Sequence, residues 1–510
     1  MTVPRRALIG ALLVPALVLG LAQQAPAGNK RSTDCRAVLG GLDLQTATIA
    51  DLESAMAQHR ITSRQLVDRY LDRIKAYDGP LDSIRSLNPN ARSEADHLDA
   101  MRRAGHLLGP LHGIPILLKD NIDTTEMPTT AGSIALEGSV PYRDATLTAR
   151  LRAAGAIILG KTNLSEFAGW LAYGAANGYS SLGGQVRSAY SYGDPLGSSS
   201  GSGVAGSMAF AAGTFGTETS GSILAPSSMN GLVGVKTTRG LVSRTGVIPL
   251  AEGFDVPGPM TRNVADAAAL LTAVAGPDPK DPASAPAKRL DYTAAIRGAR
   301  SLKGVRLGYS PSNINPQALA DLRRLGATLV STDDIENTNT AAYAELGLVP
   351  NDFKANLGTY LTTAIPTPKS GVKSLLDIVL YNQNHSDKFP YGQDLLTASA
   401  AQPGSAPAAS AASLALRTAM GALIDHVLTT NHLAAYVSPG WTNARLGAAA
   451  GYPSVTVPAG MAWVTQGMGL MFLGTAWSEA PLLRIAAAYE AGTHHRVLPQ
   501  AINPSVIKHC

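Results

Sequence analysis

Two glycine-rich clusters between Leu196 and Pro226 place serines in a setting that suits nucleophilic chemistry; they read GSSSGSG and GTETSGS. A serine hydroxyl attacks a carbonyl only when a base takes its proton. Small neighbours leave backbone N–H groups free to face a developing oxyanion, and each such donor contributes about 3–4 kcal/mol to acyl transfer. The clusters therefore indicate acyl transfer, with Ser222 in the second cluster as a candidate nucleophile.

A candidate base, Lys119, directly follows the apolar run Ile114–Leu118, which predicts a short buried strand. A lysine acts as a base when burial lowers its pKa. The spacing places Lys119 and the two serine clusters on different elements of one core, but spacing alone does not establish contact between them.

The first cluster also fits the G-x-S-x-G nucleophile elbow of α/β hydrolases, over Gly197–Gly201. That arrangement requires an acidic residue and then a histidine further along the chain. No local signature marks the available histidines, which are His426, His432, His494 and His495.

A flexible linker would also be rich in glycine and serine, but it would not enclose the run VAGSMAFAAG, which predicts a buried helix.

A second motif, Gly155–Thr162, matches the phosphate-loop pattern G-x4-G-K-[ST]. A phosphate loop needs its strand before the first glycine and a loop between the two glycines. Here the four intervening residues are apolar and themselves predict a strand, Ala156–Leu159. We therefore do not interpret this motif as a nucleotide-binding site.

The elements that must position these residues alternate between helix and strand patterns, which predicts an α/β fold with helices on both faces of a sheet. Helices are predicted over Thr48–His59, Ser63–Tyr77 (with Ser63 as its cap), Ala145–Ala154, Val264–Val274 and Leu482–Ala491. Further strands are predicted over Leu232–Lys236, Val305–Tyr309, Ala434–Ser438, Ser454–Pro458 and Gly469–Leu473, and turns or loops over Gly240–Pro259 and Gln402–Ser413.

The composition fits a large globular enzyme. The chain has 510 residues, of which 45% are hydrophobic and 15% charged, so a large core is expected. The net charge of +5 is scattered and only 5% of residues are aromatic, which argues against a nucleic-acid partner.

The first 27 residues predict an export signal, with Arg5 and Arg6 before the apolar run Ala7–Leu21 and a small-residue cleavage site at Ala25–Ala27 or, earlier, at Ala22. The alternative is a membrane anchor, for which the apolar run is short. We therefore expect a secreted or periplasmic protein. We also expect no stable membrane span after cleavage, because no later stretch is long and apolar enough to cross a bilayer.

The two cysteines, Cys35 and Cys510, could pair in an oxidising compartment or remain unpaired at frayed ends.

Eight ordered motifs together resemble the amidase signature family over residues 45–500. They are GPLHGIPILLKDNIDT, GKTNLSEFA, SSLGGQVRSAY, GSSSGSG, GTETSGSILAP, VGVKTTRGLVSRTGVIPL, GPMTRNVADAA and AGYPSVTVPAG. The resemblance implies one large domain with a central mixed β-sheet covered by helices on both faces. We expect no cofactor, and no metal because the sequence contains no metal-ligand cluster. The expected organisation is a signal peptide (1–27), an exposed lead-in (28–45), the amidase domain (46–500) and a C-terminal tail (501–510).

The family's Ser–cis-Ser–Lys triad is carried over to three residues of this chain. Ser222 becomes the nucleophile, Lys119 the base and Ser198 the bridging serine, although the run of three serines leaves Ser199 and Ser200 open. The resemblance also implies an oxyanion hole of four backbone N–H groups, those of Thr219, Ser220, Gly221 and Ser222.

Three positions depart from the family pattern. Leu196 stands where glycine is common, Ser220 stands where glycine or aspartate is usual, and Val256 stands in place of a threonine. The residue pattern Glu-Thr-x-Gly-Ser of the second cluster and the segment Asp352–Leu361 resemble peptide-amidase members more than transamidosome subunits. We therefore expect an amide hydrolase whose partner is a small-molecule or peptide amide, with an amidated peptide C-terminus as one candidate. An esterase or aryl-acylamidase with the same triad, and a non-catalytic binding protein on this fold, are the alternatives.

Overall fold

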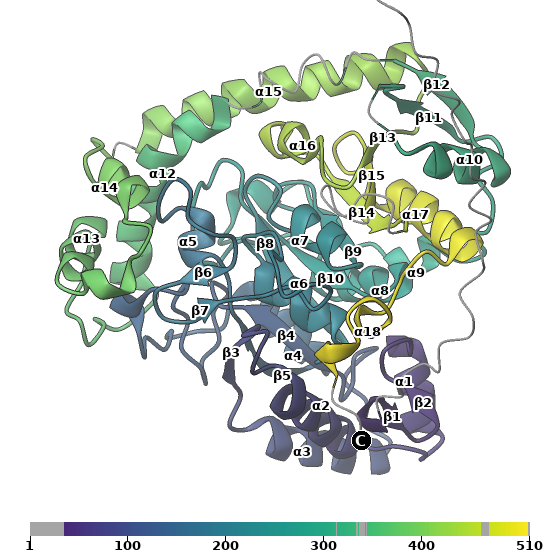
Figure 1. Cartoon of the computed structure of the whole chain (residues 1–510), viewed down its shortest axis with the longest axis horizontal. Coiled ribbons are helices and arrows are strands. Elements are labelled where there is room, and N and C mark those ends of the chain that lie inside the picture. Colours follow the sequence, from purple (N-terminus) through teal and green to yellow (C-terminus); the bar gives the residue numbers. More distant parts are fainter. Residues whose placement is uncertain are drawn as a thin grey trace, which may run out of the picture.

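An eleven-stranded mixed sheet runs through the molecule (Figure 1), in the order β12-β11-β13-β15-β14-β9-β10-β8-β4-β5-β3. The computed structural model describes residues 35–507 except 313, 333–334, 336–341, 343, 405 and 461–468. The strands are β3 (Ile84–Leu87), β4 (Pro115–Lys119), β5 (Ile157–Thr162), β8 (Gly213–Glu218), β9 (Val233–Lys236), β10 (Val256–Thr261), β11 (Arg306–Tyr309), β12 (Thr328–Ser331), β13 (Ala435–Pro439), β14 (Ser454–Pro458) and β15 (Gly469–Leu473).

Parallel pairing joins β5, β4 and β8, and so brings the carboxyl ends of three strands to one edge. Parallel pairs also link β12, β11 and β13, whereas β10 is antiparallel to both β8 and β9. Parallel strands are usually buried on both faces, and β4, β5 and β8 are buried along their whole length. The α/β class with a central mixed sheet is confirmed.

Helices cover both faces of this sheet. Successive side chains of a strand point to opposite faces; a side chain at Gly213 would meet Leu270 of α8, whereas the Thr214 hydroxyl donates to the Ser202 carbonyl of α6. The helices are α1 (Ile49–Ala57), α2 (Ser63–Tyr77), α3 (Ala91–Arg103), α4 (Thr146–Ala153), α5 (Glu166–Gly169), α6 (Ser200–Ser207), α7 (Leu224–Met229), α8 (Val264–Val274), α9 (Tyr292–Ala295), α10 (Pro316–Arg324), α12 (Ala344–Thr363), α13 (Leu375–Gln383), α14 (Asp394–Ala400), α15 (Ala406–Thr430), α16 (Ala444–Ala450), α17 (Glu479–Thr493) and α18 (Pro499–Ile502).

Local sequence explains several helix boundaries. The helix predicted over Ser63–Tyr77 is confirmed as α2, but its cap is Thr62, whose side chain forms a capping box with Gln65. The helix Val264–Val274 is confirmed as α8, where Asn263 accepts a hydrogen bond from the Asp266 N–H. A side-chain oxygen before the first apolar turn therefore fixes where these helices begin.

Two local predictions are wrong. The buried helix expected over VAGSMAFAAG is α6, but it ends at Ser207, and the last residue of the run, Gly213, begins strand β8. The surface loop expected over Gln402–Ser413 is largely the start of α15. Alanine-rich sequence favours a helix, and Pro407 stands in the first turn, where no N–H is needed.

The long helix α15 crosses the top of the molecule in Figure 1. Its segment Ala411–Thr430 has a mean hydropathy of 1.2, so it is long and apolar enough to span a membrane by length and composition, and a third of it (33%) is buried inside the protein. The expectation that no stretch beyond the N-terminus meets this test is therefore wrong for this segment, although the core helix of a soluble protein meets it too.

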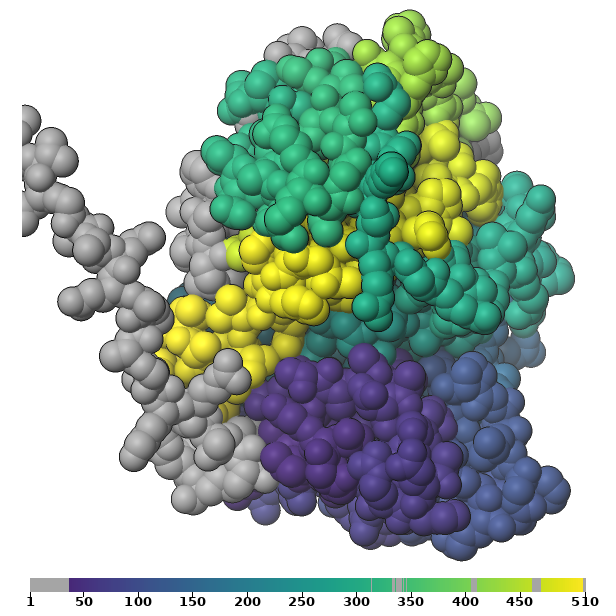
Figure 2. Space-filling model, turned by 90° about the vertical axis from the view of Figure 1, so that its right-hand side faces the viewer, coloured from purple at the N-terminus to yellow at the C-terminus, as the bar shows by residue number. Residues whose placement is uncertain are grey.

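The N- and C-terminal segments lie against one another (Figure 2). The hairpin of β1 (Val38–Leu39) and β2 (Leu42–Asp43) leads to Gln45, whose Oε1 accepts a 2.6 Å hydrogen bond from Gln500 Nε2. Within the expected lead-in, Leu44 is buried. The predicted signal peptide (1–27) and Cys510 lie outside the described residues.

Candidate active site

Lys119 is the last residue of β4 and is completely buried. Its Nζ lies 2.9 Å from Ser198 Oγ, 3.0 Å from Thr217 Oγ1 and 3.3 Å from the Thr217 carbonyl oxygen. Burial lowers the pKa of Lys119 to about 7, against the opposing effect of the Asp255 and Glu218 carboxylates. A lysine with this pKa is partly neutral near neutral pH and can accept a proton.

Ser198 is the serine of the first cluster that contacts Lys119. The Gly197–Ser198 peptide bond is cis, and Ser198 is 4% exposed. The other two serines bond elsewhere: Ser199 Oγ donates to the Thr217 carbonyl (3.0 Å) and Ser200 Oγ donates to the Leu196 carbonyl (2.6 Å). Leu196, at a position where glycine was expected, adopts a left-handed φ of 55°.

Ser222 lies in the turn between β8 and α7 and is partly buried. Its carbonyl oxygen accepts a 3.2 Å hydrogen bond from the Ser199 N–H, which joins the two serine clusters through their backbones. The preceding Gly221 has φ +93°, and a side chain there would lie 3.5 Å from the indole of Trp441. Glycine therefore suits this turn because of its positive φ, whereas a side chain there would be in ordinary van der Waals contact with Trp441.

Two buried carboxylates hold the turn that carries Ser222. Glu218 Oε2 accepts hydrogen bonds from the N–H groups of Ile223 (2.7 Å) and Leu224 (3.0 Å), which directly follow Ser222. Asp255 Oδ1 accepts a 2.5 Å hydrogen bond from the Thr219 hydroxyl. Desolvation raises the pKa of Asp255 to about 6, and hydrogen bonds from Thr219 and nearby N–H groups oppose this rise.

The structure therefore brings Lys119 and Ser198 into direct contact, and it joins the backbone of Ser222 to that of Ser199, the residue next to Ser198. Sequence reasoning missed Thr217, whose hydroxyl and carbonyl both contact Lys119. It also gave no role to Glu218, in the second serine cluster, or to Asp255, directly before Val256. The available signal was an acidic residue among small or apolar neighbours in the sequence. Such a carboxylate is rarely buried without hydrogen-bonding partners, so it indicates a structural or functional role.

The phosphate-loop match is confirmed to be a strand. Lys161 lies inside β5, is fully buried and forms an ion pair of 3.5 Å with Asp120. Among the described residues, no group of three or more His, Cys, Asp or Glu side chains could hold a metal ion.

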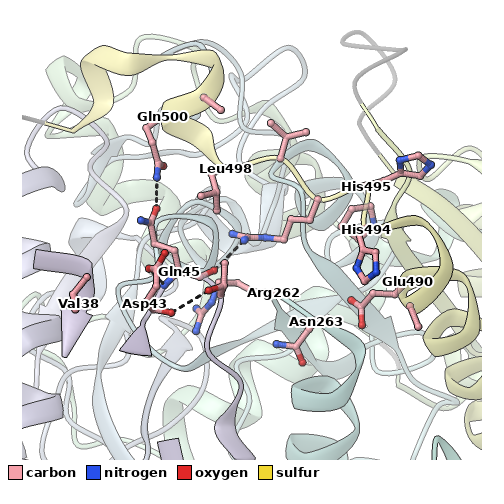
Figure 3. A pocket seen from close by; sticks show the side chains of 16 residues that line it. Val38, Asp43, Gln45, Arg262, Asn263, Glu490, His494, His495, Leu498 and Gln500 are labelled. Carbon is pink, nitrogen blue, oxygen red and sulfur yellow. Dashed lines mark hydrogen bonds between the residues drawn. The ribbon is translucent and has the colours of Figure 1, made fainter. Parts of the chain in front are cut away.

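Two larger cavities lie away from Lys119, Ser198 and Ser222, none of which lines them. A cavity of about 740 Å³ lies between the C-terminal segment and the first hairpin (Figure 3). A cleft of about 760 Å³ lies between α12 and the loops that carry Arg244 and Asp281.

Comparison with known proteins identifies the family of this chain. The Amidase family model matches residues 65–379. A probable amidase of Arabidopsis thaliana is 36% identical over 476 residues, which cover 90% of this chain and 92% of the relative. The chain therefore belongs to the amidase signature family and is an amide hydrolase.

Two further relatives bear on the kind of amide. The crystal structure of the peptide amidase of Stenotrophomonas maltophilia is 42% identical, superposes with a TM-score of 0.82, and is covered to 98% by 89% of this chain. A glutamyl-tRNA(Gln) amidotransferase component from a Synechococcus strain is 31% identical over 486 residues, with 88% of this chain and 97% of the relative covered.

Proposed function

We propose that this amidase hydrolyses carboxamides through an acyl-enzyme on Ser222, with Ser198 as the proton relay and Lys119 as the base. The observation that carries the proposal is the 2.9 Å contact between Lys119 Nζ and Ser198 Oγ in a fully buried site. A serine hydroxyl in contact with a lysine of lowered pKa can pass a proton to that lysine, and so can relay the proton of a second, nucleophilic serine.

In the proposed acylation step, neutral Lys119 takes the Ser198 proton while Ser198 takes the proton of Ser222. The Ser222 oxygen then attacks the amide carbon, and the relay returns the proton to the leaving nitrogen. A water molecule attacks the acyl-enzyme by the same route, which releases the carboxylic acid and restores Ser222.

The proposed oxyanion hole consists of the backbone N–H groups of Thr219, Ser220, Gly221 and Ser222. The Glu218 carboxylate holds this turn in place, because it accepts hydrogen bonds from the Ile223 and Leu224 N–H groups directly after Ser222. Donors fixed before the reaction stabilise the developing charge without reorganisation.

We further propose that the substrate is a peptide with a C-terminal amide, from which ammonia is released. The similarity to a peptide amidase at 42% identity over nearly all of that protein supports this choice. The Synechococcus relative, named as part of an amidotransferase, is less similar, at 31% identity.

The test is a panel of peptide amides, anilides and esters, read by ammonia or amine release and by product mass. We expect peptide amides to be hydrolysed by the wild type, and Ser222→Ala and Lys119→Ala each to lower kcat at least about a thousandfold. Activity that survives both substitutions would refute the triad, and hydrolysis of esters or anilides without peptide amides would favour the esterase or aryl-acylamidase alternative.

A further inference from the structure

The hydrogen-bonding capacity of neutral Lys119 is limited to two N–H donors and one lone pair. The Thr217 carbonyl can only accept, so it takes one N–H. The second N–H and the lone pair are then shared between the hydroxyls of Ser198 and Thr217, which lie at 2.9 and 3.0 Å. Lys119 can deprotonate Ser198 only if the lone pair faces Ser198 and the N–H faces Thr217.

The direction of the Thr217 O–H bond decides between these two arrangements. If that hydroxyl donates to Lys119, it occupies the lone pair, and Ser198 has no base. Thr217 Oγ1 already accepts a 3.0 Å hydrogen bond from Asn121 Nδ2. The productive arrangement therefore has Thr217 Oγ1 accept twice, from Lys119 and from Asn121, and donate its own hydrogen to a third group.

A small cavity lined by Asn121 and Thr217 offers a place for that third group. It has a volume of about 10 Å³, and Asn121, Thr217, Thr219 and Asp255 are among its lining residues. Asn121 is 3% exposed, and its Oδ1 has no hydrogen-bond partner among the described residues. A polar cavity of about 10–15 Å³ is large enough for one water molecule with two to four partners.

We propose that this cavity holds one ordered water that accepts the Thr217 hydroxyl hydrogen and donates to Asn121 Oδ1 and to the Asp255 carboxylate. The water completes three hydrogen bonds, which is the usual number for a buried water. It turns the Thr217 hydroxyl away from Lys119 and leaves the lone pair for Ser198. Asn121 and Asp255 are thus positioning residues, and this role rests on the proposed function of Lys119.

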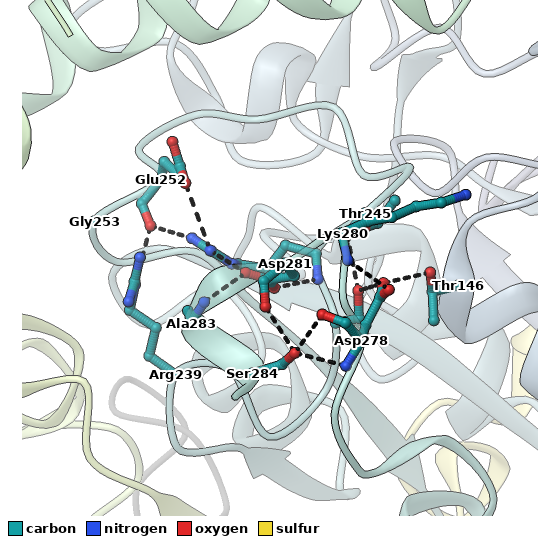
Figure 4. A network of polar contacts seen from close by, with 12 residues as sticks. Thr146, Arg239, Thr245, Glu252, Gly253, Asp278, Lys280, Asp281, Ala283 and Ser284 are labelled. Atoms are coloured by element: carbon teal, nitrogen blue, oxygen red, sulfur yellow. Dashed lines mark hydrogen bonds and ion pairs between the residues drawn. The ribbon is translucent and has the colours of Figure 1, made fainter. Parts of the chain in front are cut away.

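The cavity also has a side from which water can exchange. Arg244, Val247 and Asp255 line both the small cavity and the 760 Å³ cleft. Arg239 donates a hydrogen bond to the Glu252 carbonyl (Figure 4). Arg244 donates to the same carbonyl and forms a 2.5 Å ion pair with Asp281, so the two arginines hold the loop before Asp255. This loop presents the Leu250 and Ala251 N–H groups to Asp255 Oδ2.

The first test is a high-resolution crystal structure of the wild-type protein. We expect an ordered water within hydrogen-bonding distance of Asn121, Thr217 and Asp255. A cavity without water, or an Asn121 side chain that bonds Thr217 through its oxygen, would overturn the proposal. This measurement does not depend on activity, so it tests the water site even if the proposed reaction is wrong.

The second test uses Asn121→Leu, which removes both amide groups at similar side-chain size. We expect the rate constant of Ser222 acylation to fall at least about tenfold while KM stays within about twofold, because the free Thr217 hydroxyl then blocks the lone pair. Adding Thr217→Val to this variant removes the blocking hydroxyl, so the double variant should recover activity. Adding Thr217→Ser should not.

A purely structural role of Asn121 would not produce this recovery. Asn382→Leu on α13 is the matched control, because Asn382 is also buried and its Oδ1 also has no partner among the described residues; we expect its kcat to stay within about twofold of the wild type. Near-normal acylation in Asn121→Leu, or no recovery with Thr217→Val, would refute the proposal. Hydrolysis by Ser222→Ala at the wild-type rate would instead refute the proposed function.

Discussion

The protonation of buried Lys119 should be visible in the pH dependence of folding stability. Its pKa is about 7 in the folded protein, against an ordinary value of 10.5. Between these pH values the unfolded chain binds one proton more than the folded chain, so stability falls as the pH decreases from about 10 to about 7. Below pH 7 both states bind the proton and this contribution becomes constant.

The perturbation is Lys119→Met, which keeps the side-chain length and removes the titrating group. From the two pKa values, the wild type should lose about 3 kcal/mol of unfolding free energy relative to this variant between pH 9 and pH 6. Since other groups titrate alike in both proteins, their effects largely cancel in the difference. The variant should also be the more stable protein at pH 6, because a buried charge has been removed.

The assay is urea unfolding of both proteins at several pH values between 6 and 9, with the exposed Lys303→Met as the control for loss of one positive charge. For the wild type, kcat/KM on a hydrolysed amide should fall about tenfold per pH unit below pH 7. A difference in stability that does not change with pH would show that Lys119 stays charged in the folded protein. The reasoning for Lys119 as the base would then be refuted.

Two further substitutions test the supports of the site. Lys161→Met leaves the buried Asp120 carboxylate without its cation, so we expect a loss of about 3–5 kcal/mol in urea unfolding at pH 7.5, and partial recovery when Asp120→Asn is added; a loss below about 1 kcal/mol would contradict this. Thr219→Val removes the hydroxyl that bonds Asp255, and we expect a stability loss of about 1–3 kcal/mol together with a lower kcat, whereas Thr219→Ser should keep both. Equal kcat for the Val and Ser variants would show that this bond does not position the turn.

Elements with a strong local signal were predictable. Helix α8 and strands β14 and β15 have the boundaries that the sequence predicted, because apolar periodicity and capping residues are local features. Strand β8, which reads GTFGTE, was missed because its glycines and alternating polar residues give little strand propensity. Its stability comes from pairing with β4 and β10 on either side.

The candidate site shows the same division. Ordered motifs named Lys119, Ser198 and Ser222, but three consecutive serines fitted the bridging position equally well by residue type. The resemblance favoured Ser198, and the fold agrees, since Ser198 contacts Lys119 whereas the hydroxyls of Ser199 and Ser200 bond to the Thr217 and Leu196 carbonyls. Asn121 and Thr217 had no sequence signal as partners, because they are 96 residues apart along the chain.

The sequence by itself determined the family, the α/β class and the residue types of an acyl-transfer site, since these follow from motifs and local periodicity. Tertiary structure decided which serine meets the lysine and how far the pKa of that lysine falls. Both depend on the parallel pairing of β4 with β8, which brings Lys119 beside Thr217 and buries it completely. Contact and desolvation arise only when distant segments pack together, so no local pattern can specify them.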